Sequence, residues 1–459
     1  MVLPVAEIDR LLGIEVYASG TSRVGGVIRG SVDDFVVEEV LVDGSKAQIS
    51  PASTKKVLGA SLEYQRYLLC ILVKRNWDTF IAIKNIAKNL GIDQNRIQIA
   101  GIKDAKAVTG QYITIENVSM EDAAKVNVKD ITVHPVGYVR NPLSLFYLLG
   151  NSFTLKIRSI EKEESSVKEQ LEQTMLELGC VGGIPNFYGH QRFGTTRPIT
   201  HLVGKAILKG DFEEAALVFL AKPSVDEHPS SRHAREELQS SGNFKLALEN
   251  FPKQLRFERL MLNYLVDKAG DFAGAFRVLP IKLQMLFVQA YQSFLFNRFL
   301  SERVKRGLPL GLATVGDFVV GVERSGLPMV NVAKTVTAES LSKVNESIAS
   351  GRLRVALPIV GFKQKLSEGV MGEIEKQVLE EEDINLDGFR VTSLSKLGGR
   401  GSLRTAVTPV NDFKLLDVTK DINGKNCVVS LSFMLFRGCY ATVLLREVMK
   451  PTNPITAGF

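Results

Sequence analysis

The sequence predicts an α+β protein with a mixed, largely antiparallel sheet, on three observations. The first 160 residues alternate short strand-like runs with helical runs. Helical patterns then dominate the middle of the chain. A strand-like run returns at 427–436, and a helix from about Ala441 follows it. We therefore expect a sheet-containing domain formed by residues 1–210 and 405–459, interrupted by a mostly helical domain inserted at 211–404.

The first two predicted elements are a strand and a helix. Residues 34–40, DFVVEEV, are rich in Val and Phe, which favours a strand. Residues 77–91 predict a helix that begins after Asp78 or Thr79 as N-cap and stops at Gly91. Its apolar residues recur at helical spacing, at Phe80, Ile83, Ala87 and Leu90.

Two further runs, 96–101 and 111–115, alternate apolar and polar residues and predict strands. The connection between them carries Asp104, flanked by Lys103 and Lys106. A loop between two strands can aim a side chain from a rigid scaffold. Taken alone, the stretch is better explained as a solvated turn. The alternative is that Asp104 is a nucleophile or base whose charge the lysines maintain.

Later elements extend the same pattern. Residues 152–160 predict a strand, and a helix is predicted from Ser166 to Gly179, with Ser166 and Glu169 as a capping box. A long helical pattern covers 282–307. The glycine-rich stretch 396–404, KLGGRGSLR, predicts a hinge or loop, and a flexible linker suits it better than a phosphate cradle.

Composition indicates an ordinary globular protein with a mild positive charge. Lys and Arg number 57 against 50 Asp and Glu, a formal charge of +7, which favours an anionic partner only weakly. Four cysteines form no CxxC pair, so neither a zinc ribbon nor a disulfide framework is expected. No apolar run approaches the roughly 18 residues of a membrane span. We expect a cytoplasmic protein with no membrane association.

Several chemistries lack their sequence signatures. The chain contains no GxxxxGK[ST] loop, and the strand–turn–helix setting of a dinucleotide fingerprint is missing. Its five histidines show no HExxH or other ligand spacing, so no metal site is expected.

Segment 186–194, NFYGHQRFG, combines aromatic rings with Gln191 and Arg192. Such groups can stack a nucleobase and bind its polar edge. The alternative is an aromatic loop that anchors a domain junction, and on the segment alone this is the commoner case. Phe35 and Tyr440, in two other candidate segments, are by type more often core residues than ligand contacts.

Six segments taken together, however, resemble the TruD family of pseudouridine synthases in order and spacing, most closely its archaeal members. The segments are DFVVEE (34–39), KRNWDT (74–79), GIKDAKAVTGQ (101–111), NFYGHQRFG (186–194), AYQSFLFNRFLSER (290–303) and YATVLLRE (440–447). The resemblance implies a pseudouridine-synthase fold with the family's helical domain inserted after the fourth segment. It also implies isomerisation of a uridine in structured RNA, typically position thirteen of tRNA.

The resemblance assigns site residues one by one. Asp104 falls on the family's catalytic aspartate, and Phe35, Asn186 and Tyr440 fall on positions that line the uridine pocket. Tyr188 stands where relatives usually have Phe, and its hydroxyl needs a partner if it is buried. The Asn186 amide, with a donor and an acceptor, suits the imide edge of uracil.

The implied reaction breaks the N1–C1′ bond, turns the uracil and rejoins it through C5, so no cofactor or metal is expected. Asp104 can act as a nucleophile or as a base for a ribose proton. Its ionised form requires a nearby cation, for which Lys103 and Arg29 are the candidates. We expect tRNA as partner and a monomer; a non-catalytic RNA-binding or chaperone protein is the alternative, and an enzyme of free nucleotides is a third reading.

Overall fold

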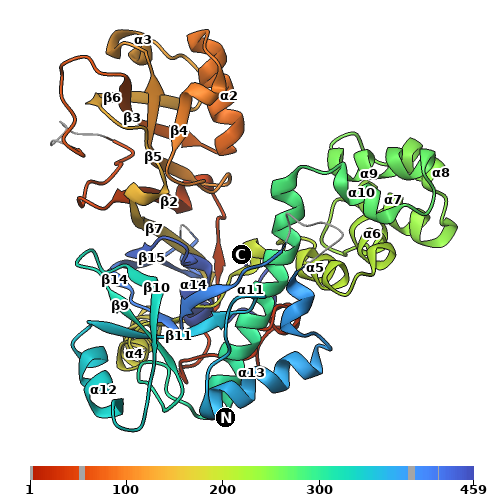
Figure 1. Ribbon diagram of the computed structural model, residues 1–459. Helices are drawn as coiled ribbons and strands as arrows, with labels where there is room; N and C mark the ends of the chain where they lie inside the picture. The colour runs from red at the N-terminus through yellow and green to blue at the C-terminus, as the bar shows by residue number, and fades with distance from the viewer. Residues whose placement is uncertain (1–3, 51–56, 391–397, 422) are drawn as a thin grey trace.

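The computed structural model describes residues 4–50, 57–390, 398–421 and 423–459. Figure 1 shows three regions around a central helix, α11 (Ile281–Lys305). A lobe from the first third of the chain, drawn in orange, stands at the top. Green helices lie to the right, and cyan strands lie at the lower left.

The main sheet extends from the upper lobe into the middle of the molecule. Its strand order is β14-β15-β7-β2-β5-β3-β6, with β1 beside β7 and β4 beside β5. Its strands are β1 (Val27–Ile28), β2 (Phe35–Leu41), β3 (Tyr67–Arg75), β4 (Ile97–Ile99), β5 (Val108–Glu116), β6 (Ile131–Val139), β7 (Leu148–Ile160), β14 (Asn411–Lys420) and β15 (Cys427–Phe436). Among these described strands only β2 and β5 pair in parallel. The expected mixed, largely antiparallel sheet is confirmed.

Two helices, α2 (Thr79–Leu90) and α3 (Met120–Ala124), pack on the upper part of this sheet. The apolar face of α2, with Ile83 and Ile86, joins the buried core of β3 and β5. Asp78 caps the start of α2 by accepting hydrogen bonds from two backbone N–H groups, and Gly91 ends it with φ +67°. The predicted bounds of this helix are confirmed.

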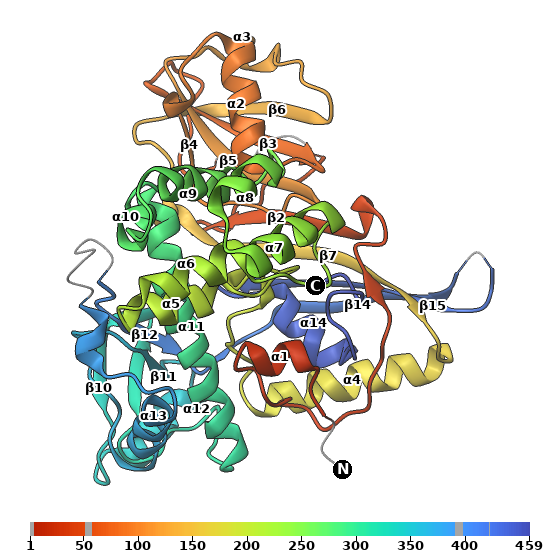
Figure 2. The same ribbon diagram turned by 90° about the vertical axis from the view of Figure 1, so that its right-hand side faces the viewer.

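On the central part of the sheet, α4 (Glu164–Cys180) and α14 (Ala441–Met449) lie side by side on one face, as Figure 2 shows. The predicted capping box of Ser166 and Glu169 is wrong, because α4 begins earlier and Glu163 is its N-cap. Ser166 therefore lies inside the first turn, where its hydroxyl accepts a hydrogen bond from Gln170.

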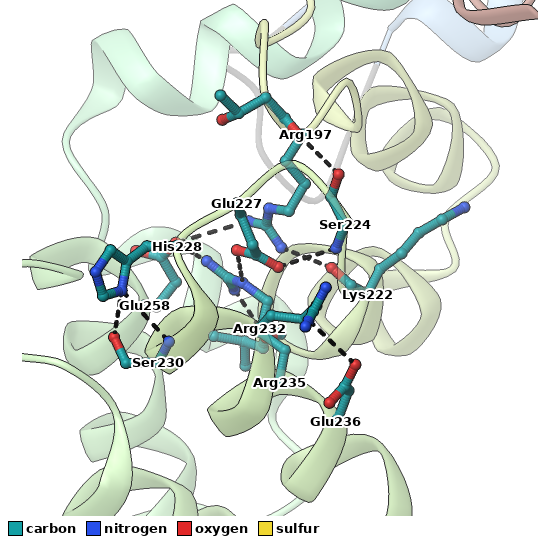
Figure 3. A network of polar contacts seen from close by, with 12 residues as sticks. Arg197, Lys222, Ser224, Glu227, His228, Ser230, Arg232, Arg235, Glu236 and Glu258 are labelled. Atoms are coloured by element: carbon teal, nitrogen blue, oxygen red, sulfur yellow. Dashed lines mark hydrogen bonds and ion pairs between the residues drawn. The ribbon is translucent and has the colours of Figure 1, made fainter. Parts of the chain in front are cut away.

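The green region is a helical bundle that leads into α11. Its helices are α5 (Thr200–Leu208), α6 (Phe212–Ala221), α7 (Pro229–Ser241), α8 (Phe244–Asn250), α9 (Arg256–Asp267) and α10 (Phe272–Arg277). Arg235 of α7 is buried and donates to Glu227, to Glu258 and to the carbonyl oxygens of Phe219 and Leu220 (Figure 3). One guanidinium thus joins α6, α7 and α9.

The middle of the chain also contains a second sheet, which the helical patterns did not reveal. It has the order β10-β9-β11-β12. Its elements are β9 (Phe318–Val322), β10 (Pro328–Thr335), β11 (Leu353–Ile359) and β12 (Ser402–Thr405), accompanied by α12 (Leu341–Ala349) and α13 (Gly369–Glu381).

The described part of the glycine-rich stretch, from residue 398, leads into β12 as a loop. The carbonyl oxygens of Gly399 and Arg400 accept hydrogen bonds from the N–H groups of Phe362 and Lys363. These bonds fix the loop against the end of β11, so it is not a flexible linker. Residues 396 and 397 of the stretch lie outside the described residues.

Candidate active site

A cavity of about 410 Å³ lies between the start of β2, the loop after β4, the first half of β7 and the β15–α14 connection. Phe35 at the start of β2 lines one side, and Tyr440, just before α14, lines another. The loop after β4 contributes Asp104. The volume lies in the range of small-molecule sites, about 300–1,000 Å³. Three segments far apart in sequence therefore form one pocket.

Asp104 presents its carboxylate to this cavity. The side chain is 37% exposed, and its Oδ1 accepts a hydrogen bond from Nη2 of Arg29 at 3.2 Å. The backbone oxygen of Asp104 accepts a second bond, from Nζ of Lys74 at 2.7 Å. One cation thus faces the carboxylate while another fixes the loop that carries it.

Arg29 is held on three sides. Its Nη1 donates to the carbonyl oxygen of Gly458 at 2.9 Å, and its guanidinium carbon lies 4.2 Å from the centre of the Phe35 ring. Its backbone has φ +57°, an uncommon conformation for a residue other than glycine. Burial lowers the pKa of Arg29, while the negative charge of Asp104 acts in the opposite direction. The side chain is fixed before any ligand arrives.

Lys103, the other candidate partner, turns away from Asp104. Its Nζ donates to Oε1 of Glu39 at 2.6 Å, and both side chains are buried. Its backbone N–H donates to Oγ1 of Thr79. A buried lysine requires such a partner, and β2 supplies it in Glu39. Of the two candidates, Arg29 makes the contact with Asp104 and Lys103 secures the loop.

Lys74 was not among the residues that the sequence singled out for the site. It ends the apolar run of β3 and is fully buried. Burial lowers the pKa of Lys74 to about 8, although the charges of Asp104 and Asp78 act to raise it. The available signal was its place as the first residue of KRNWDT, one of the six recognised segments.

The aromatic walls of the cavity are also fixed. Phe35 is 1% exposed, and its ring contacts Phe153 edge to face, with centres 6.1 Å apart. Tyr440 meets the ring of Tyr188 at 6.2 Å, again edge to face. Burial raises the pKa of the Tyr440 hydroxyl. Phe35 is thus both a core residue and part of the cavity wall.

Asn186 and Tyr188 line a neighbouring cavity of about 210 Å³ rather than the one that holds Asp104. The Asn186 side-chain oxygen accepts from Nη2 of Arg404 at 2.6 Å, and its nitrogen donates to Oγ1 of Thr405 at 3.1 Å. Arg404 also lies over the Tyr188 ring, 4.2 Å from its centre. Both ends of the Asn186 amide are therefore engaged within the protein.

Two other amides border the Asp104 cavity. Gln191 is exposed, and its oxygen accepts a hydrogen bond from Thr442, which also lines the cavity. The side-chain oxygen of Asn151, on β7, is buried without a hydrogen-bond partner. Arg192, in contrast, bonds Ser293 and Gln289 of α11 and braces the segment. Gln191 and Asn151 are thus the amides that border this cavity.

The described residues offer neither a metal site nor a membrane-spanning helix. No group of three or more His, Cys, Asp or Glu side chains lies close enough to hold a metal ion. Within the same residues, none of the helices is long and apolar enough to cross a membrane.

Comparison with known proteins gives consistent matches. A sequence model of the family described as "tRNA pseudouridine synthase D (TruD)" matches residues 11–448. Proteins named "Probable tRNA pseudouridine synthase D" are similar along nearly the whole chain. The one from Methanosarcina mazei is 36% identical and covers 99% of both chains; the one from Thermococcus sibiricus is 38% identical, covering 95% of this chain and 97% of its own.

Comparison of the fold with solved structures gives a match to the same family. A crystal structure described as that of the "Putative tRNA pseudouridine synthase D (TruD) from Methanosarcina mazei" superimposes with a TM-score of 0.84 at 35% identity. It covers 99% of this chain and 100% of its own. Since the family match spans nearly the whole chain, the chain belongs to the tRNA pseudouridine synthase D (TruD) family and is a pseudouridine synthase, an isomerase.

Proposed function

We propose that this protein converts a uridine of tRNA, at position thirteen, to pseudouridine, with Asp104 as the catalytic carboxylate and without a cofactor. The observation that carries the proposal is the Asp104 carboxylate, which faces a cavity with aromatic walls and has Arg29 as counter-ion. The reaction needs an ionised carboxylate beside a flat base, in a site that faces a polyanion. Arg29 donates a hydrogen bond to that carboxylate at 3.2 Å.

Asp104 acts on the ribose or the base in one of two ways. As a nucleophile it forms a covalent bond to the sugar or the uracil, and that bond breaks again when C5 bonds to C1′. As a base it removes a ribose proton and later returns it. In both cases the N1–C1′ bond breaks, the C5–C1′ bond forms, the C5 proton leaves to solvent and N1 takes up a proton from solvent. Atoms and electrons balance without an external reagent.

The cavity walls have separate tasks in this proposal. Phe35 and Tyr440 contact the faces of the uracil, which is extruded from the RNA to reach Asp104. Tyr188 supports Tyr440 through their edge-to-face contact, and Asn186 holds Arg404 against Tyr188. Gln191, whose amide is exposed at the cavity, binds the polar edge of the base. Lys103 contributes by holding the catalytic loop to Glu39.

We further propose that residues 1–210 and 405–459 form the catalytic domain and that 211–404 is an inserted domain. In support, the main-sheet strands all lie in the first two ranges, whereas α6 to α13 and β9 to β11 lie in the third. Basic residues of both domains bind the RNA backbone, so affinity falls as salt rises.

The test is tritium release from tRNA transcribed with C5-tritiated uridine, because isomerisation frees the C5 hydrogen. Wild-type protein should release tritium, and Asp104→Asn should not, while both bind the RNA. Asp267→Asn, an exposed aspartate on α9, is the matched control and should keep full activity. Mapping of the product should place pseudouridine at position thirteen.

Other results would favour the other readings. RNA binding without tritium release from a broad tRNA pool would indicate a non-catalytic RNA-binding protein. Isomerisation of free UMP at a comparable rate would indicate a nucleotide enzyme. Full activity of Asp104→Asn would remove the catalytic role of this residue.

A further inference from the structure

Two large apolar side chains that line the Asp104 cavity are exposed, and a third exposed one is next to them in sequence. Ile102, Leu145 and Phe146 expose 63%, 59% and 84% of their surface. Ile102 and Leu145 line the cavity itself, and Phe146 follows Leu145 directly. Single exposed apolar residues are ordinary on protein surfaces. Two of them that line one cavity, with a third directly after one of these in the sequence, indicate a surface that something covers.

The chain holds Leu145 and Phe146 outward on a short, well-anchored turn, the 3₁₀ segment Leu145–Tyr147 between β6 and β7. Leu143 before it and Leu148 after it are buried in one core cluster. The apolar tip is therefore presented to solvent between two buried anchors.

Hydrogen bonds fix this turn further. Arg437, in the β15–α14 connection, donates from Nη1 to the carbonyl oxygens of Leu145 at 2.6 Å and Leu148 at 3.1 Å. The Tyr147 carbonyl oxygen accepts from the N–H of Val42 at 2.9 Å. The turn is thus tied to the residues that directly follow β2 and β15, which gives its tip a fixed position.

Ile102 lies on the catalytic loop close to the same turn. A Cβ added to Gly101 would lie 3.2 Å from Cδ2 of Leu148, so the loop and the turn pack against each other. The residues after Ile102 are held in place, Lys103 by Glu39 and Asp104 by Arg29 and Lys74. Ile102 thus remains exposed on a loop that is otherwise secured.

We propose that Ile102, Leu145 and Phe146 form an apolar wedge that enters the RNA base stack at the gap left by the extruded uridine. This inference rests on the proposed function. Extrusion breaks base stacking on both sides of the target and opens a gap that water fills poorly. An apolar side chain inserted between base steps restores contact and keeps the base from returning.

The position of the wedge indicates that nucleobases cover it. Leu145 and Ile102 border the cavity that receives the target base, so the surface next to them faces the nucleotides on either side of that target. Flat nucleobases cover exposed aliphatic and aromatic side chains without leaving polar groups unpaired. The wedge therefore contacts bases, whereas the phosphates are left to basic residues.

The first test compares Phe146→Ala with wild type on two substrates, a folded tRNA and a short single-stranded RNA that contains the same target uridine. The wedge matters only where a stack must be opened. The rate on folded tRNA should therefore fall about tenfold or more, and the rate on the single strand less than twofold. Phe146→Trp should restore the rate. Phe257→Ala, an exposed phenylalanine on α9, is the matched control.

The second test measures base unstacking and does not require the isomerisation reaction. A tRNA with 2-aminopurine next to the target reports loss of stacking as a rise in fluorescence when protein binds. Asp104→Asn protein should give this rise, and the double variant with Phe146→Ala should give less than half of it at equal saturation.

Two results would overturn the wedge. One is an equal loss of rate on both RNAs, which would assign Phe146 to general support of the site. The other is unchanged rate and fluorescence, which would leave the exposed patch to some other partner. If wild type releases no tritium, the proposed function fails, and the fluorescence result alone decides the wedge.

Discussion

Arg29 and Asp104, 75 positions apart in the sequence, meet through one hydrogen bond of 3.2 Å between Nη2 and Oδ1. The same guanidinium also binds the carbonyl oxygen of Gly458 and stacks over Phe35. The position of the carboxylate is therefore set by segments from three parts of the chain. Testable consequences follow for each partner.

Arg29→Met should lower the single-turnover rate on the order of a hundredfold, because the carboxylate loses the hydrogen-bond donor that holds it in place at the cavity. Arg29→Lys should lose less activity. Lysine keeps the positive charge, but it lacks the two Nη groups through which Arg29 reaches Asp104 Oδ1 and the carbonyl oxygen of Gly458. Single-turnover rates of the two variants at saturating RNA test this. Wild-type rates in both variants would contradict it.

Gly458→Ala should reduce activity by displacing the segment that holds Arg29. Gly458 has φ +90°, and a Cβ there would lie 2.2 Å from the carbonyl oxygen of Ile28. The backbone must shift, and the bond from Arg29 moves with it. We expect a loss of activity of about tenfold and a loss of stability of about 1–3 kcal/mol. Tritium release and thermal unfolding measure the two.

Gly44→Ala separates conformational strain from this displacement. Gly44 has φ +83°, but nothing lies within 4 Å of an added Cβ. This variant should lose stability from its backbone conformation while its activity stays at the wild-type level. Equal loss of activity in the two glycine variants would contradict the role of the Gly458 segment.

Lys74→Met should change how stability depends on pH. Burial lowers the pKa of Lys74 from its usual 10.5 to about 8 in the folded protein. Between pH 8 and 10.5 the unfolded chain therefore binds more protons at this site, so the folded state gains stability as pH rises. The free energy of unfolding of wild type minus that of Lys74→Met should increase across this window by up to about 3 kcal/mol. Urea titrations at several pH values test the sign.

Arg235→Met should destabilise the helical bundle by about 3–5 kcal/mol, because Glu227 loses its ion-pair partner and Glu258 keeps only the longer contact with Arg197, at 3.6 Å. Arg232→Met, on the same helix, is the control in Figure 3. Arg232 is 40% exposed and pairs with Glu236 at 3.7 Å, so its loss should cost less than about 1 kcal/mol. Hydrogen exchange of α6, α7 and α9 measures both effects, and similar values for the two variants would contradict the prediction.

The sequence was most informative where local signals were strong. Asp78 and Gly91 mark the ends of α2 because capping depends on neighbouring residues only. The strand at Cys427–Phe436 has the predicted bounds because its β-type run is continuous, which is also a local signal. The capping box at Ser166 failed because two polar residues before it, Glu164 and Ser165, also adopt helical geometry.

Local signals could not predict contacts between segments that lie far apart in the sequence. Lys103 adjoins Asp104 in sequence, yet its ammonium group pairs with Glu39. The burial of Lys74 could not be inferred either, because a lysine at the end of a strand is usually solvated. The position of Asn186 beside Arg404, in the neighbouring cavity, likewise depends on how β12 packs against the 186–194 segment.

The bond between Arg29 and Gly458 spans 429 positions of the sequence. A ribosome adds roughly 5–20 residues per second, so Arg29 and Asp104 leave the exit tunnel many seconds before Gly458 is made. Until then the guanidinium lacks one of its two hydrogen-bonding anchors, so Arg29 is held only in part while Asp104 has already emerged. The contacts that fix the Arg29–Asp104 pair in the nascent chain are therefore complete only after residue 458 has been added.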